Sequence, residues 1–178
     1  MTCIVGLVHK DKVYMGGDSC GSSVSSWTYV GNPKVFKVQN KFLIGCTSSF
    51  RMIDLLTHKL NVQREHPDDS DDLFMRTTFI EGVRNCLKEG GFAKTSAPES
   101  GGNFLVGYNG KLYEVQGDYS ILNCPDWGSS VGSGEGPARG SLWTTRNDKD
   151  PKKRVQIALE AAEAVVPSVR GPMVILDM

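Results

Sequence analysis

The stretch Thr2-Cys-Ile-Val-Gly-Leu-Val8, followed by Val13-Tyr-Met-Gly16, opens the chain with two runs rich in β-forming residues. The polar residues Lys10-Asp11-Lys12 separate these runs and are typical of a tight connection. We therefore expect a β-hairpin at the start of the chain, with Thr2 at the beginning of its first strand.

Further hairpins and short strands are expected along the chain. Residues 34–38 alternate polar and apolar side chains and return through Gln39-Asn40. The pair Asn109-Gly110 favours a type I′ turn between two β-rich runs. The expected later strands are 34–38, 41–46, 104–108, 111–115, 120–124, 129–131 and 173–176. A Ser/Gly tract at 19–26 carries no expected strand, and 92–102 is interpreted as a loop.

Helices are expected in two pairs. After the hydroxyl residues 47–49, Phe50, Ile53, Leu56 and Leu60 recur on one helical face, which predicts a helix over 49–60. An acidic loop at 68–72 precedes an amphipathic segment over 73–87 that ends at Gly90-Gly91. The second pair is expected at 137–143 and, with apolar positions from 155 to 165, in the segment after Pro151.

The order of these elements predicts the fold class. Four strands, two helices, about four strands, two helices and a last strand favour an α+β architecture, with two antiparallel sheets and the helices outside them. A length of 178 residues suits one domain, and we expect a single domain over residues 1–178.

Composition argues against several classes of function. The 20 basic and 20 acidic residues give no net charge, so we expect no nucleic-acid partner. No stretch approaches the ~20 apolar residues of a membrane helix. The five cysteines have no C-x-x-C spacing, which suits reduced thiols and a cytoplasmic location. The three histidines form no H-E-x-x-H motif, so neither a metal nor a cofactor is expected.

A threonine near the amino terminus can carry chemistry once Met1 is removed. Its α-amine can accept the proton from its own hydroxyl, so no histidine is needed. The reference pKa of an α-amine is roughly 7.7 to 8.0, and a neighbouring cation increases the fraction of free base. A partly buried lysine in turn requires a carboxylate beside it. Thr2, Asp18 and Lys34 can form this set.

Several motifs together resemble one family. Thr2-Cys-Ile-Val-Gly-Leu-Val, Met15-Gly-Gly-Asp18-Ser, Asn32-Pro-Lys34-Val-Phe and Gly132-Ser133-Gly134 are similar to segments of proteasome β-subunits and their bacterial relatives. The aspartate lies sixteen residues and the lysine thirty-two residues after the threonine, as in that family. This resemblance implies a four-layer αββα sandwich, the N-terminal nucleophile hydrolase fold, with Thr2 at the start of a central strand and Lys34 at the start of a neighbouring one.

The resemblance also implies a function and a set of site residues. It makes the chain a threonine-type endopeptidase or amidase, with peptide or unfolded substrates, in a self-assembled ring that an unfoldase partner can serve. Thr2 is then the nucleophile, Lys34 its electrostatic activator, Asp18 the partner of Lys34, and Ser133 a hydroxyl near the α-amine. The resemblance places the Ser48 N–H at the oxyanion, where glycine is usual, and Gly21, Ser22, Asn32 and Cys46 around the substrate.

The last turn departs from the family pattern. The family carries an Asp and then Ser-Gly-Gly, whereas this chain has Val165-Val-Pro-Ser168-Val-Arg170-Gly171-Pro. Glu163, one helical turn earlier, is a conjectural substitute for the Asp. The alternative function is therefore a catalytically silent subunit of the same fold with a structural or assembly role, and a retained Met1 favours this alternative.

Two other nucleophiles are less favoured. Cys3 becomes N-terminal only if two residues are removed, and a small buried thiol in the first strand is the simpler interpretation. Gly128-Ser-Ser130-Val-Gly132 matches the G-x-S-x-G elbow of serine hydrolases. That motif requires a later histidine, and every histidine precedes it.

Overall fold

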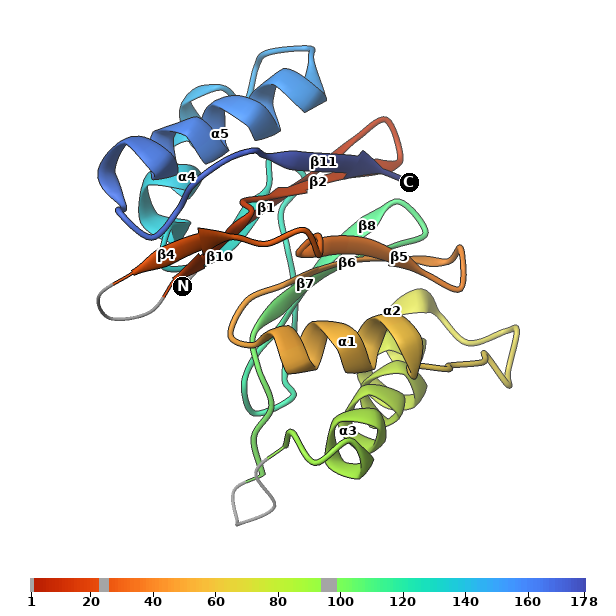
Figure 1. Ribbon diagram of the computed structural model, residues 1–178. Helices are drawn as coiled ribbons and strands as arrows, with labels where there is room; N and C mark the ends of the chain where they lie inside the picture. Colours follow the sequence, from red (N-terminus) through yellow and green to blue (C-terminus); the bar gives the residue numbers. More distant parts are fainter. Residues whose placement is uncertain (1, 23–25, 94–98) are drawn as a thin grey trace.

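Two antiparallel β-sheets lie face to face at the centre of the molecule, with helices on both outer sides (Figure 1). The computed structural model describes residues 2–22, 26–93 and 99–178. The first sheet has the strand order β10-β1-β2-β11, and the second has the order β5-β6-β7-β8-β9. The strands of the two sheets are β1 (Cys3–His9), β2 (Lys12–Gly17), β5 (Val35–Val38), β6 (Phe42–Cys46), β7 (Phe104–Tyr108), β8 (Lys111–Val115), β9 (Ile121–Asn123), β10 (Ser129–Gly132) and β11 (Val174–Asp177).

The helices form the two outer layers. α4 (Glu135–Thr144) and α5 (Pro151–Val165) cover the first sheet, and α1 (Phe50–His58) and α3 (Ile80–Glu89) cover the second (Figure 1). A short α2 (Asp71–Phe74) and a π-helical turn (Met75–Phe79) lead directly into α3. This is the expected four-layer αββα sandwich, so the predicted fold class is confirmed.

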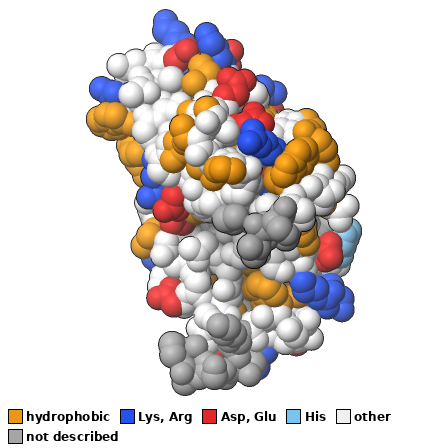
Figure 2. All heavy atoms as spheres, turned by 60° about the vertical axis from the view of Figure 1, so that its left-hand side comes forward, with side chains coloured by type: hydrophobic (Ala, Val, Ile, Leu, Met, Phe, Trp, Pro, Cys, Tyr) orange, Lys and Arg blue, Asp and Glu red, His pale blue; other side chains and the backbone are white. Residues whose placement is uncertain are grey.

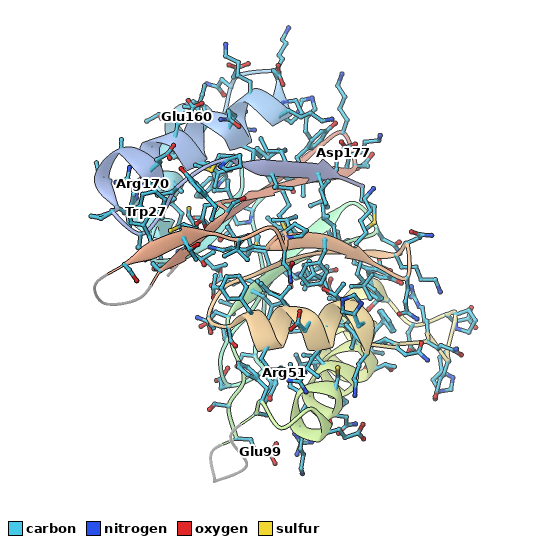
Figure 3. The ribbon with its side chains drawn as sticks, in the orientation of Figure 1. Trp27, Arg51, Glu99, Glu160, Arg170 and Asp177 are labelled. Carbon is cyan, nitrogen blue, oxygen red and sulfur yellow. The ribbon has the colours of Figure 1, made fainter. Side chains whose placement is uncertain are left out.

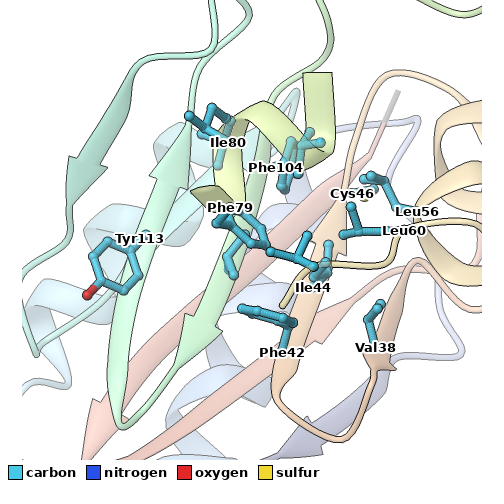
Figure 4. Close-up of a cluster of buried hydrophobic side chains, with 14 of the residues drawn as sticks. Val38, Phe42, Ile44, Cys46, Leu56, Leu60, Phe79, Ile80, Phe104 and Tyr113 are labelled. Carbon is cyan, nitrogen blue, oxygen red and sulfur yellow. The ribbon is translucent and has the colours of Figure 1, made fainter. Parts of the chain in front are cut away.

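Three clusters of buried side chains fill the three spaces between the layers. One lies between the second sheet and its helices and includes Phe42, Phe79 and Phe104 (Figure 4). A second joins Cys3, Val5 and Leu7 of β1 to α4 and α5. The third includes Ile4, Met15, Leu43 and Leu105 and lies between the sheets. Alternate residues of β1 thus face different layers, which explains why this strand is apolar along most of its length.

The sequence signals located most elements correctly. Asn109 and Gly110 have φ angles of +46° and +72°, as a type I′ turn requires. The Ser49 hydroxyl accepts a hydrogen bond from the Arg51 N–H and caps α1. The Ser70 hydroxyl, within the acidic loop at 68–72, accepts a hydrogen bond from the Leu73 N–H and caps α2.

Three expectations need correction. The Ser/Gly tract contains β3 (Cys20–Ser22), which pairs with β4 (Trp27–Tyr29), so six strands precede α1. Lys34 precedes a strand of the second sheet and not a neighbour of β1 within the first. The segment over 73–87 is not one regular helix, since the π-helical turn interrupts it. Residues 23–25 of the tract, residues 94–98 of the expected loop and Met1 lie outside the described residues.

Candidate active site

Strand register gathers the predicted site residues at one end of the two sheets. Cys3 pairs with Gly132, so Thr2 lies opposite Ser133. Ile4 pairs with Gly17 on the other side of β1, which places Asp18 next to Cys3. In the second sheet, the Cys46 N–H donates to the Lys34 carbonyl, so Lys34 lies beside the turn that follows β6. The site therefore lies between the two sheets.

Lys34 is the centre of the site. Its Nζ donates to Thr2 Oγ1 at 2.9 Å, to Asp18 Oδ2 at 2.9 Å and to the Cys20 carbonyl at 2.6 Å. These contacts use all three protons of an ammonium group, which has no lone pair with which to accept one. The side chain is 2 % exposed, and that of Asp18 is fully buried. Lys34 thus has the environment of a buried cation that polarises the Thr2 hydroxyl.

Asp18 is fixed by the backbone as well as by the lysine. Its Oδ1 accepts the Cys3 N–H at 2.9 Å, and its Oδ2 accepts the Cys20 N–H at 3.0 Å. Charge-assisted hydrogen bonds of this kind stabilise a carboxylate and hold its position. Asp18 therefore joins the start of β1, the start of β3 and Lys34 into one rigid unit.

Two serine hydroxyls lie on the other side of Thr2. The Thr2 N–H donates to Ser133 Oγ at 3.2 Å, and Ser133 Oγ lies 3.3 Å from Ser168 Oγ. Gly132, beside Ser133, has a φ of +100°, and a side chain there would collide with the Thr2 carbonyl. Glycine is therefore required at this position. Ser168 was not among the predicted site residues. The serine of the last-turn pattern was the signal that could have indicated it, but the thirty-five residues between Ser133 and Ser168 hide their contact in the sequence.

Glu163, the conjectural substitute for the missing Asp, faces the last turn. Its Oε1 accepts the Gly171 N–H at 2.9 Å, so it binds the backbone of the last turn. The Ser19 N–H and hydroxyl hold the same turn by donating to the carbonyls of Arg170 and Pro172. Sequence spacing alone could not show that this carboxylate faces the turn.

Ser48 is held in a conformation that glycine adopts more easily. Its φ is +66°, and the Ser49 N–H donates across it to the Thr47 carbonyl. Within the described part of the chain, the Ser48 N–H has no hydrogen-bond acceptor. The amino end of α1 follows directly and adds the positive end of its dipole. Such an N–H, beside a helix amino terminus, can bind a developing negative charge.

A cavity of about 340 Å³ lies beside Thr2, Lys34 and Ser48. It is lined by Thr2, Cys20, Gly21, Ser22, Lys34, Cys46, Thr47, Ser48, Ser49, Phe50, Arg51 and Ile53. The predicted Gly21, Ser22, Cys46 and Ser48 are all present, whereas Asn32 is exposed and does not line the cavity. Phe50, which belongs to the predicted apolar face of α1, is 39 % exposed and lines the cavity.

The Cys3 thiol is a packing group. It is fully buried, and burial together with the Asp18 carboxylate raises its pKa to about 12. A thiol with such a pKa is almost wholly protonated at neutral pH and is a poor nucleophile. The interpretation of Cys3 as a small core side chain is confirmed.

Across residues 2–22, 26–93 and 99–178, no cluster of His, Cys, Asp and Glu has the composition of a metal site. In those ranges no helix combines the length and the apolar character needed to cross a membrane.

The arrangement of layers is that of a known fold. Two facing antiparallel sheets between helical layers form the αββα sandwich of the proteasome-type N-terminal nucleophile hydrolase fold.

Solved structures with this fold superpose on nearly the whole chain. BPH from Thiobacillus denitrificans matches with a TM-score of 0.82 and 16% identity over 99% of this chain and 97% of that protein. HslV from Trypanosoma brucei matches with a TM-score of 0.72 and 15% identity over 99% and 98%. Anbu from Yersinia bercovieri matches with a TM-score of 0.68 and 12% identity over 99% and 81%. The Thiobacillus protein has also been solved in complex with epoxomicin.

The sequence comparisons gave no corresponding result. No protein-family model matches the chain, and no curated protein matches it. The likeness is therefore one of fold.

Proposed function

We propose that this protein is a threonine-type endopeptidase or amidase whose nucleophile is Thr2 after removal of Met1. The observation that carries the proposal is the buried contact of the Lys34 ammonium with both Thr2 Oγ1 and Asp18, each at 2.9 Å. A buried lysine–carboxylate pair is costly to desolvate, so its placement against a hydroxyl favours a catalytic role over a structural one.

The first chemical step uses the two ends of Thr2. Oγ1 attacks the carbonyl carbon of the scissile amide, and its proton passes to the free α-amine, directly or through a water molecule. Lys34 cannot accept that proton while it remains an ammonium, so its part is electrostatic. Ser133, which contacts the Thr2 nitrogen, orients the amine.

The second step breaks the amide bond. The tetrahedral oxyanion accepts the Ser48 N–H and faces the amino end of α1. The protonated α-amine then gives its proton to the leaving amine, and a threonyl ester remains. Attack by water on this ester, with the α-amine again as base, releases the acid and restores Thr2.

The surroundings of the site support a choice of substrate and assembly. Cys46, Phe50 and Ile53 line the cavity beside Gly21, which suits a small to medium apolar side chain of a peptide or unfolded substrate. In keeping with the fold shared with HslV, we propose a homo-oligomeric ring that receives substrates from an unfoldase partner, and a single domain over residues 1–178. All five cysteines are free thiols, in keeping with the cytoplasm.

The decisive experiment compares Thr2→Ala with Thr2→Ser in purified protein. Thr2→Ala should lower peptide hydrolysis by at least about a thousandfold, and Thr2→Ser should retain measurable turnover because it keeps the hydroxyl. Intact mass spectrometry of each variant establishes that Met1 has been removed. Epoxomicin, which binds the Thiobacillus protein, should add to the wild type and not to Thr2→Ala. A processed wild type without turnover or adduct would leave the silent structural subunit as the function.

A further inference from the structure

A series of contacts through the turn between α5 and β11 links the Glu163 carboxylate to the Thr2 nitrogen. Glu163 is on α5, half-buried, and its Oε1 accepts the Gly171 N–H at 2.9 Å. Gly171 belongs to the turn between α5 and β11, which also carries Ser168. Ser168 Oγ lies 3.3 Å from Ser133 Oγ, which in turn lies 3.2 Å from the Thr2 nitrogen.

Ser19, the residue after Asp18, holds the same turn on both sides of Gly171. The Ser19 N–H donates to the Arg170 carbonyl at 3.0 Å, and its hydroxyl donates to the Pro172 carbonyl at 2.7 Å. The turn therefore has two attachments, one to the Asp18 side of the site and one to α5. The glutamate provides the second, through a charge-assisted hydrogen bond that is stronger than a neutral one.

From this geometry we infer that Glu163 is a positioning residue for the α-amine. It holds the 168–172 turn so that Ser168 fixes the Ser133 hydroxyl against the Thr2 nitrogen. The inference rests on the proposed function for its catalytic consequence. Glu163 acts through Gly171 and Ser168, so its role depends on the acceptor oxygen and not on a charge placed beside the amine.

Substitutions of Glu163 separate the role of its acceptor oxygen from that of its charge. Glu163→Ala removes the acceptor and should lower kcat by about ten- to hundredfold with KM unchanged, because a displaced amine transfers the proton poorly. Glu163→Gln keeps an oxygen at the same reach and should restore kcat close to the wild-type value. Glu160→Ala is the matched control, since Glu160 lies one turn earlier on α5, where it bonds to Gln156 (Figure 3).

A double-mutant cycle tests the route of the effect. If Glu163 acts through Ser168, the Glu163→Ala/Ser168→Ala variant should be no slower than the slower single variant. Additive losses in kcat would overturn the inference, as would a Glu163→Gln variant as slow as Glu163→Ala. A fall in thermal stability with kcat intact would also overturn it, because the residue would then only support the fold.

Hydrogen exchange provides a readout that does not depend on turnover. The Gly171 amide should exchange faster in Glu163→Ala than in the wild type, and at the wild-type rate in Glu160→Ala. Unchanged exchange at Gly171 would overturn the inference whatever the activity. Faster exchange in a protein that hydrolyses no peptide would defeat the proposed function and still support Glu163 as the residue that holds the turn.

Discussion

At the scale of single residues, Asp18 and Lys34 show how a site can be inferred from spacing and then explained by contacts. Three features indicated them in the sequence: a threonine near the start and two charges at fixed distances after it. The structure buries both charges and places the Lys34 ammonium between Thr2 Oγ1 and the Asp18 carboxylate. Their catalytic roles stay proposals, but their proximity is a property of the fold.

This pair leads to a stability prediction. Asp18→Ala leaves the Lys34 ammonium buried without its counter-charge, and we expect a loss of about 3–5 kcal/mol in the free energy of unfolding. Adding Lys34→Met to that variant should recover much of the loss while the protein remains inactive, since the unpaired charge is gone. Chemical denaturation measures both changes.

The control for this pair lies on the surface. Lys12 and Asp177 approach to 4.0 Å with side chains 59% and 31% exposed, so Lys12→Ala should leave the unfolding midpoint nearly unchanged. Equal effects at Lys12 and Asp18 would contradict the view that burial makes the inner pair sensitive.

Ser48 marks a limit of residue-scale reasoning. The resemblance indicated that its N–H is the oxyanion donor and that glycine is usual there. Only the structure shows that the serine at this position has a left-handed backbone conformation, with φ of +66°. A positive φ at a residue other than glycine costs free energy and persists where the surroundings enforce it. The γ-like turn from Thr47 to Ser49 and the cap of α1 provide that enforcement.

At the scale of elements, close contact between the two sheets depends on small residues. A side chain on Gly45 of β6 would meet Ile4 at 2.5 Å and the Met15 sulfur at 2.6 Å. We predict that Gly45→Ala destabilises the protein by about 1–3 kcal/mol, because both neighbours belong to the core between the sheets. Equilibrium unfolding in urea tests this value.

A glycine elsewhere is the matched control. Gly140 lies on α4 with no atom within 4 Å of where its side chain would be. Gly140→Ala should stabilise the protein by up to about 1 kcal/mol, since alanine is the better helix former. A stabilising Gly45→Ala would show that the two sheets can separate without cost.

Hairpins and helices with local signals were predictable, whereas the ribbon of β3 and β4 was not. The Asn109-Gly110 turn and the apolar spacing after Pro151 depend on residues close together in the chain, so they can be recognised in the sequence. β3 is three residues long and has half-buried glycine and serine residues, so it lacks the alternation of a typical strand. Its strand conformation depends on pairing with β4 and on the Asp18 contact with the Cys20 N–H.

At the scale of the whole molecule, apolar side chains remain on the surface near the site. Trp27 and Tyr29 of β4 are 56% and 59% exposed, and Val165 at the end of α5 is 67% exposed. Figure 2 shows one face of the molecule, on which several groups of apolar side chains lie between charged side chains. Exposed aromatic residues are enriched at protein interfaces.

We therefore predict that the protein self-associates. Light scattering at micromolar concentration should give a mass several times the 19.4 kDa of one chain. Trp27→Lys should lower that mass, and Trp143→Lys, which alters an equally accessible tryptophan on α4, is the comparison. A strictly monomeric wild type would contradict a ring and the enclosed chamber that it implies.

The sequence by itself determined the fold class and most elements, because periodicity and turn residues are local or cumulative signals. It indicated the trio of Thr2, Asp18 and Lys34 through the resemblance of their spacing to that of proteasome β-subunits. Only the tertiary structure decided that Lys34 leads into a strand of the facing sheet, that Ser168 contacts Ser133, and that Glu163 binds the last turn. These contacts join residues that are distant in the chain or that face one another across layers. Their geometry is set by strand register and layer packing, which no short stretch of sequence encodes.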